Sequence, residues 1–140
     1  MTKLIGIAII AAAIVAMGCG GGQMTVAEYA EWCGALEEQS ATDLSFEDMT
    51  NGQALKALNE GVIEYNKVSA PDVLKELHNI RQGLLQSSIS VIASENANDE
   101  FNAWGLLGVA FVGGTAALEA VSKLPPSVHR QLVEAECIGS

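Results

Sequence analysis

The sequence is poor in cations. Only seven Lys and Arg stand against 17 Asp and Glu in 140 residues, for a formal net charge of −10. Nucleic acids and anionic lipid headgroups are negative as well, so such a chain repels both. We therefore expect no nucleic-acid partner, and we interpret the acidic surface as one that keeps a domain soluble.

Side chains that carry catalysis or bind metals are also scarce. The two histidines, His78 and His129, lie 51 positions apart, and neither has a Cys, His or acidic residue at a metal-binding spacing. The sequence contains no nucleophile elbow, phosphate loop, paired-histidine helix or Cys-x-x-Cys motif. We expect no cofactor, no metal and no catalytic residues, which leaves an enzyme as the least favoured class.

Residues 1–18 predict an export signal. A single cation, Lys3, precedes an uncharged stretch over residues 4–18 that ends in small residues before Cys19. This stretch is shorter than the roughly 20 residues that a membrane-spanning helix needs. The protein is therefore expected to be exported, with residues 1–18 removed as a cleaved signal peptide.

The motif Ala16-Met17-Gly18-Cys19 resembles the lipobox of bacterial lipoproteins, in which a small residue precedes a cysteine that becomes lipidated and N-terminal. The resemblance implies that Cys19 is lipidated and holds the protein at a bacterial membrane, on its extracytoplasmic side. Ala16 stands where a larger aliphatic is common, and Met17 where a small residue is common. Cleavage by the ordinary signal peptidase, leaving Cys19 as a free thiol on a secreted protein, and a retained N-terminal anchor are the alternatives.

The remaining chain is long enough for one domain. Residues 19–24 include three consecutive glycines and form a flexible tether. Residues 25–140 can bury one core of their own but are too few for two comfortable domains. Because Lys3 is lost with the signal, the mature chain carries six cations against 17 acids, a net charge of −11.

Apolar residues in this domain recur at helical spacing, and no strand pattern or internal repeat is visible. Capping boxes mark the start of two helices: Thr25 is followed by Glu28, and Thr50 by Gln53. Residues 40–49 are polar and predict a loop between them. Pro71 predicts the first position of a third helix, which carries two adjacent apolar stripes.

Residues 103–118 carry no charge and are apolar all the way round. We interpret them as the central and most buried helix of a bundle, capped by Asn98 or Asp99. Gly108 and Gly114 would then allow neighbouring helices to approach closely. At 1.5 Å per residue this helix spans about 24 Å, short of a bilayer core of about 30 Å. A membrane-inserting hairpin is the alternative interpretation.

A short last helix over residues 127–137 should turn Val128 and Leu132 inward. The predicted fold class is therefore all-α: a single helical bundle of four main helices plus a short C-terminal helix, after a cleaved N-terminal signal peptide.

The cysteine count predicts a disulfide between Cys33 and Cys137. Assigning Cys19 to lipid leaves two cysteines in an oxidising compartment, which is the even number that a bridge requires. Cys33 lies on the inward stripe of the first helix with Tyr29, and Cys137 ends the last helix. Two buried free thiols are the competing possibility.

Three functional classes follow. The first is an exported, lipid-anchored helical protein with a non-catalytic binding or structural role at the cell envelope, where its partners would be the membrane and another envelope protein. The second is a small-ligand carrier, because the two cysteines, Leu124-Pro-Pro126 and Arg130 resemble exported haemophore-type domains. An enzyme is the third.

The carrier class has few candidate residues, and each has a simpler structural explanation. A satisfied, partly buried histidine is favoured for His78, and aromatic residues at helical spacing usually belong to the core. The candidate haem ligands are His78, His129, Tyr29 and Tyr65; the residues that could line a small-molecule pocket are Trp32, Trp104, Tyr29 and Tyr65.

Overall fold

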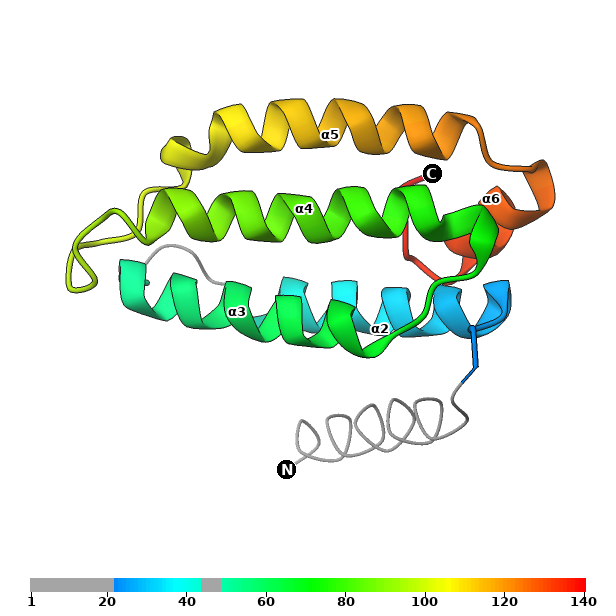
Figure 1. Ribbon diagram of the computed structural model, residues 1–140, viewed down its shortest axis with the longest axis horizontal. Coiled ribbons are helices and arrows are strands. Elements are labelled where there is room, and N and C mark those ends of the chain that lie inside the picture. The colour runs from blue at the N-terminus through cyan, green and yellow to red at the C-terminus, as the bar shows by residue number, and fades with distance from the viewer. Residues whose placement is uncertain (1–21, 44–48) are drawn as a thin grey trace.

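Helices make up nearly all of the regular structure in this computed structural model, which describes residues 22–43 and 49–140, with the backbone alone for residues 40–43 (Figure 1). The predicted all-α class, with four main helices and a short fifth, is confirmed for these residues. The predicted signal peptide and Cys19 lie outside them. The elements are α2 (Val26–Asp43), α3 (Asn51–Lys67), η2 (Asp72–Leu74), α4 (Lys75–Ile92), η3 (Ala103–Leu106), α5 (Leu107–Ser122) and α6 (Pro126–Glu134).

Both predicted capping boxes are present. The backbone N–H of Thr25 donates to Glu28 Oε2 at 2.7 Å, and the N–H of Glu28 donates to Thr25 Oγ1 at 3.2 Å. Thr50 and Gln53 make the same reciprocal pair at 2.9 and 3.3 Å. Each pair satisfies two backbone donors that have no partner inside the helix, so both start positions can be predicted from local sequence.

Several helix boundaries differ from the expectation; the last helix, for example, ends at Glu134 and not at Cys137. The first helix continues to Asp43 instead of ending at residue 39, because no glycine or proline interrupts the polar residues that follow. Pro71 caps the short 3-10 turn η2 and does not occupy the first position of an α-helix. Its backbone is extended, and α4 begins only at Lys75.

The fourth helix also starts later than predicted. The segment after α4 is tied to the start of α3, where Asn51 N donates to Asp99 O at 2.9 Å and Phe101 N donates to Met49 O at 2.7 Å. These bonds hold the chain extended beyond Asn98 and Asp99. The cap is therefore Asn102, whose side chain accepts from Trp104 N at 3.0 Å.

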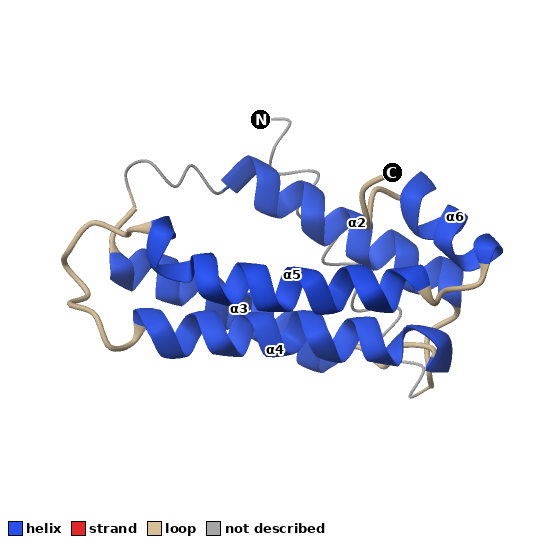
Figure 2. Ribbon diagram, turned by 90° about the horizontal axis from the view of Figure 1, so that it is seen from above, coloured by secondary structure: helices blue, strands red, loops and turns tan. Residues whose placement is uncertain are grey.

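The helices lie in three tiers. In Figure 1, α2 and α3 form the lower tier, α4 the middle and α5 the upper tier. Helix α4 packs against α3 on one side and α5 on the other, and α6 packs against α2. Figure 2, turned by 90°, shows α5 running alongside α4.

The prediction that residues 103–118 form the central, most buried helix is therefore wrong. Helix α5 packs mainly on α4 and the turn η3, and most of its side chains are exposed or half-exposed. The central position belongs to α4, because it carries two adjacent apolar stripes and can bury both against different neighbours. An apolar helix without a stripe has no such directional preference.

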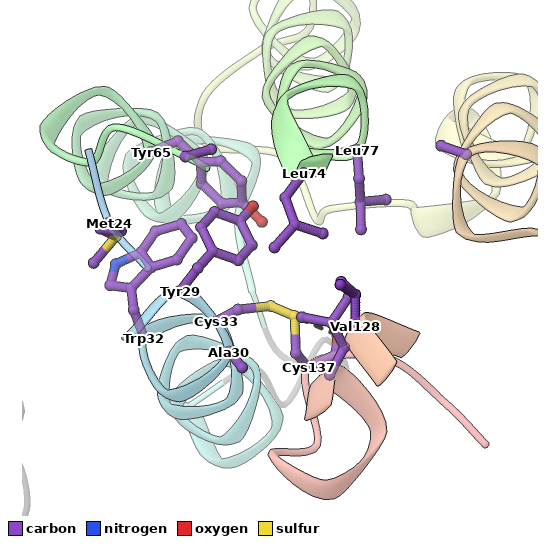
Figure 3. Close-up of a cluster of buried hydrophobic side chains, with 13 residues drawn as sticks. Met24, Tyr29, Ala30, Trp32, Cys33, Tyr65, Leu74, Leu77, Val128 and Cys137 are labelled. Atoms are coloured by element: carbon purple, nitrogen blue, oxygen red, sulfur yellow. Dashed lines mark hydrogen bonds between the residues drawn. A yellow bond between two sulfur atoms is a disulfide. The ribbon is translucent and has the colours of Figure 1, made fainter. Parts of the chain in front are cut away.

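The main core lies where α2, α4 and α6 meet (Figure 3). Its most deeply buried side chains include Tyr29, Leu74, Leu77 and Leu132, each 0–1% exposed. Val128 and Leu132 point into this core from α6, as predicted. A second, smaller cluster of Ala54, Ile92 and Phe101 lies at the other end of α3 and α4.

The glycines of α5 separate into two kinds. A Cβ atom built on Gly113 would lie 1.9 Å from Leu84 Cδ2 and 2.4 Å from its Cγ, so any larger residue there would force the Leu84 side chain of α4 to move. A Cβ on Gly108 or Gly114 would meet no atom within 4 Å. The expectation that Gly108 and Gly114 face a packed neighbour within the chain is therefore also wrong.

Alanine substitutions should separate these two kinds of glycine. We expect Gly113→Ala to be less stable than Gly108→Ala by about 1 to 3 kcal/mol, because overpacking applies only at Gly113 and the gain in helix propensity is common to both. Urea denaturation of the two variants measures the difference in the free energy of unfolding. Equal stabilities would contradict the contact with Leu84.

Candidate functional site

The structure joins Cys33 and Cys137 by a disulfide, as the cysteine count predicted, with their Cα atoms 5.0 Å apart. Both residues are 1% exposed. The bond attaches α2 to the segment that follows α6. Gly34 allows this close approach, because a Cβ atom there would lie 1.8 Å from the backbone oxygen of Ala135.

Arg81 brings α4 into the same junction. Its Nη1 donates to Cys33 Sγ at 2.8 Å, and its Nη2 donates to the backbone oxygen of Cys137 at 2.8 Å. Glu37 lies 3.6 Å from Nη1 and supplies the opposite charge. One guanidinium group therefore links α2, α4 and the C-terminal segment beside the disulfide. We call this group of residues, Glu37, Arg81, Cys33 and Cys137, the disulfide junction.

The buried histidine has both ring nitrogens occupied. His78 Nε2 lies 3.2 Å from the backbone oxygen of Tyr65, and Nδ1 lies 3.0 Å from the Tyr29 hydroxyl. A carbonyl oxygen only accepts, so Nε2 donates to Tyr65 and, in neutral histidine, Nδ1 accepts from Tyr29. Burial lowers the pKa of His78, although the bond to Tyr65 opposes this shift. Burial likewise raises the pKa of Tyr29.

The structure therefore brings some of the sequence-derived candidates together and separates others. Tyr29, Trp32, Tyr65 and His78 form a cluster in which neighbouring rings are tilted or edge-to-face, with centroids 5.1 to 5.9 Å apart. This arrangement confirms the satisfied histidine and the aromatic core favoured for these residues. His129 lies apart on α6, and Trp104 lies in η3 with 76% of its surface exposed.

A cavity of about 400 Å³ lies between α2, α3, α4 and η3. Its lining is mainly apolar and includes Leu58, Leu84 and Phe101, with Arg81 and Glu37 also lining it. The volume is at the small end of the range of about 300 to 1,000 Å³ typical of ligand pockets. A small-ligand carrier would use this space.

The most unusual surface is on α5. Five large apolar side chains on η3 and α5 are 54–77% exposed, and residues 103–118 contain no charge. By length and composition, 103–122 could cross a membrane, yet only a small part of this helix is buried in the protein. We define the outer face of α5 as Trp104, Leu107, Phe111, Val112 and Leu118.

This outer face was missed from the sequence although its signal was visible. The absence of charge in residues 103–118 predicts burial inside the chain, whereas no residue in the described part of the chain covers that surface. Monomeric proteins seldom expose contiguous apolar patches larger than a few hundred Å², and such patches mark interaction sites.

Comparisons with protein-family models, with curated proteins and with solved structures find no match for this chain. Among residues 22–43 and 49–140, no three Cys, His, Asp or Glu side chains are grouped so that they could hold a metal ion. The outer face of α5 is therefore the candidate functional site that these residues support best.

Removing the disulfide should destabilise the domain strongly. The bond closes a span of 104 positions, and replacing Cys33 and Cys137 together by alanine should lower the free energy of unfolding by about 2 to 5 kcal/mol. Urea denaturation measures this loss, with Cys19→Ala as the control that leaves stability unchanged. Labelling of Cys33 and Cys137 in denatured protein without reductant would contradict the bond.

The buried His78 should make stability pH-dependent. Its pKa is lower in the folded protein than in the unfolded chain, so the unfolded chain binds the proton first as the pH falls. Stability should therefore decrease from about pH 6.5 downward, by at most about 1.4 kcal/mol per pH unit for one proton. Denaturation between pH 7.5 and 5 should show a shallower decrease for His78→Gln than for His129→Gln, and identical decreases would refute this origin.

Proposed function

We propose that this protein is an exported, non-catalytic binding protein of the bacterial cell envelope, anchored through an acylated Cys19, and that it binds its partner through the outer face of α5. The observation that carries the proposal is the exposure of five large apolar side chains on η3 and α5, within the uncharged residues 103–118. At about 25 cal/mol per Å², covering about 400 Å² of apolar surface would contribute about 10 kcal/mol before the costs of association.

Two features support export. A disulfide persists in oxidising compartments and is rare in the cytosol, and the bond between Cys33 and Cys137 is buried in the core. The lipobox-like motif ending at Cys19 supplies the anchor in this proposal. A single acyl chain holds a protein only marginally, so the multiple acylation implied by the resemblance is needed for stable attachment.

The position of α5 favours a protein partner over the anchoring membrane. Helix α2, which follows the tether, belongs to the tier opposite α5 (Figure 1). The tether from Cys19 to Met24 reaches at most about 18 Å. A bilayer that holds the anchor would therefore lie near the start of α2, on the side of the bundle away from the outer face of α5.

A small-ligand carrier is the second candidate, and the cavity of about 400 Å³ favours it. Haem ligation by His78 is disfavoured, because both of its ring nitrogens are hydrogen-bonded in the core. The cavity would suit a small apolar ligand with a polar end near Arg81. A Soret band on adding haem would instead support the haem-binding form of this candidate.

The anchor can be tested directly. We expect intact-mass measurement of the membrane fraction to show a chain that begins at Cys19 and carries acyl groups, because the motif positions Cys19 after a cleavable apolar segment. The variant Cys19→Ser should move the protein to the soluble fraction. A soluble wild-type product with an unmodified Cys19 would contradict the anchor.

The binding face can be tested by hydroxyl-radical footprinting. In dilute purified protein, Trp104, Phe111 and Leu118 should be labelled readily, because each is more than 70% exposed. In intact membranes from the producing cell, the same three residues should be protected. Ile63, on α3 and 53% exposed, is the matched control and should label equally in both samples. Equal labelling of all four residues would contradict the proposed function.

A further inference from the structure

We propose that the partner covering the outer face of α5 is a second copy of the same chain, packed as an antiparallel helix pair about Phe111. This inference rests on the proposed function, which makes that face the binding surface. It adds the identity of the partner and the geometry of the contact.

The exposed side of α5 has the spacing of a helix-packing seam. Trp104, Leu107, Phe111, Gly114 and Leu118 follow one another at alternating steps of three and four residues. This is the a and d spacing by which one helix packs along another. We call these five residues the open seam. Apolar residues at these steps fit against a second helix, whereas binding to a flat bilayer surface would not require this spacing.

The opposite side of α5 already carries such a seam. Leu106, Val109, Gly113 and Ala120 also follow at steps of three, four and seven residues, and all are buried or half-buried. Gly113 makes the close contact with Leu84 of α4. Helix α5 therefore has two seams on opposite sides, and among the described residues only the seam toward α4 is filled.

Three pairs of positions on the outer side of α5 are related by a centre at Phe111. Gly108 and Gly114 lie three residues from it on either side, and Trp104 and Leu118 lie seven residues from it. Two antiparallel copies centred on Phe111 would therefore place Phe111 opposite Phe111, Trp104 opposite Leu118 and Gly108 opposite Gly114, while Leu107 would lie opposite Thr115. Such a pair uses the same patch on both subunits, as a two-fold interface does.

The two open glycines acquire a role in this pair. Glycine destabilises an exposed helix relative to alanine, and neither Gly108 nor Gly114 is needed for packing inside the chain. In the antiparallel pair, Gly108 of one copy lies beside Gly114 of the other, on both sides of the central Phe111. The two backbones can then approach closely where no Cβ atom intervenes.

Area and charge are both compatible with this partner. A standard interface buries about 800 Å² per partner, and a buried Trp or Phe contributes about 150 to 250 Å². Trp104 and Phe111 can thus supply up to about half of this area, and Leu107 and Leu118 add to it. Residues 103–118 bring no charge into the contact, so the net charge of −10 on each chain stays outside it.

Cysteine cross-linking of the full chain in its own membrane tests the pair. One chain carries Gly108→Cys and a co-produced chain carries Gly114→Cys. We expect a disulfide-linked dimer on a non-reducing gel, at least about tenfold more than either variant gives alone. Two copies of Cys at position 108 would be displaced along the helix by six residues, about 9 Å, which is too far for a disulfide.

Two controls accompany this measurement. Ile63→Cys, exposed on α3, should give no more dimer than wild type. Adding Phe111→Glu to both cross-linking chains should reduce the linked dimer at least about tenfold, because it places two like charges together at the centre. Since Phe111 is 77% exposed in the single chain, this variant should keep the wild-type melting temperature.

The outcomes distinguish the two proposals. Cross-links of each variant with itself, and none between the two, would overturn the antiparallel pair in favour of a parallel one. Cross-linking no higher than for Ile63→Cys, with the outer face still protected in membranes, would refute the second copy and leave the proposed function standing with another partner. Absence of both cross-linking and protection would refute both proposals.

Discussion

The disulfide between Cys33 and Cys137, together with Arg81, is the constraint on which the rest of the bundle depends. Helix α2 packs mainly against the short helix α6, and the bond ties these two elements together. Arg81 extends the junction to α4 through bonds of 2.8 Å to Cys33 Sγ and to the Cys137 oxygen. Around it, His78 is hydrogen-bonded to the Tyr29 hydroxyl and to the Tyr65 backbone oxygen within the aromatic core, so a covalent bond and hydrogen bonds together hold this end of the molecule.

Helix α5, on the other side of α4, is held by apolar contacts and not by a covalent bond. The narrow contact at Gly113 brings the two helices close together. Nothing described in the chain covers its other side, where large apolar side chains are exposed. A rigid, cross-linked end combined with one uncovered helix is the arrangement expected of a protein that presents a preformed surface, because little ordering entropy is then lost on binding.

The proposed envelope function joins these two parts. Oxidising conditions outside the cytoplasm would favour the disulfide, and the short tether before α2 would keep the domain near the membrane while α5 lies on the far tier. The net negative charge of the chain is consistent with this function, because it would repel anionic lipid and nucleic acid. Residues 103–118 of η3 and α5 carry no charge, so this repulsion is weakest at the proposed binding face.

Local sequence by itself determined the all-α class and the inward residues of α6, because both depend on the periodicity of apolar residues. It also determined the capped starts of α2 and α3, which depend on side chains three residues apart. The pairing of Cys33 with Cys137 followed from the count of cysteines. Only the tertiary structure decided which helix is central and where the fourth helix begins. An uncharged helix such as α5 suits a protein core and an interface equally well, since both remove apolar surface from water. Its position depends on α4, whose two stripes take the middle place, and on the backbone bonds of Asn51 and Phe101, which tie the segment after α4 to the start of α3.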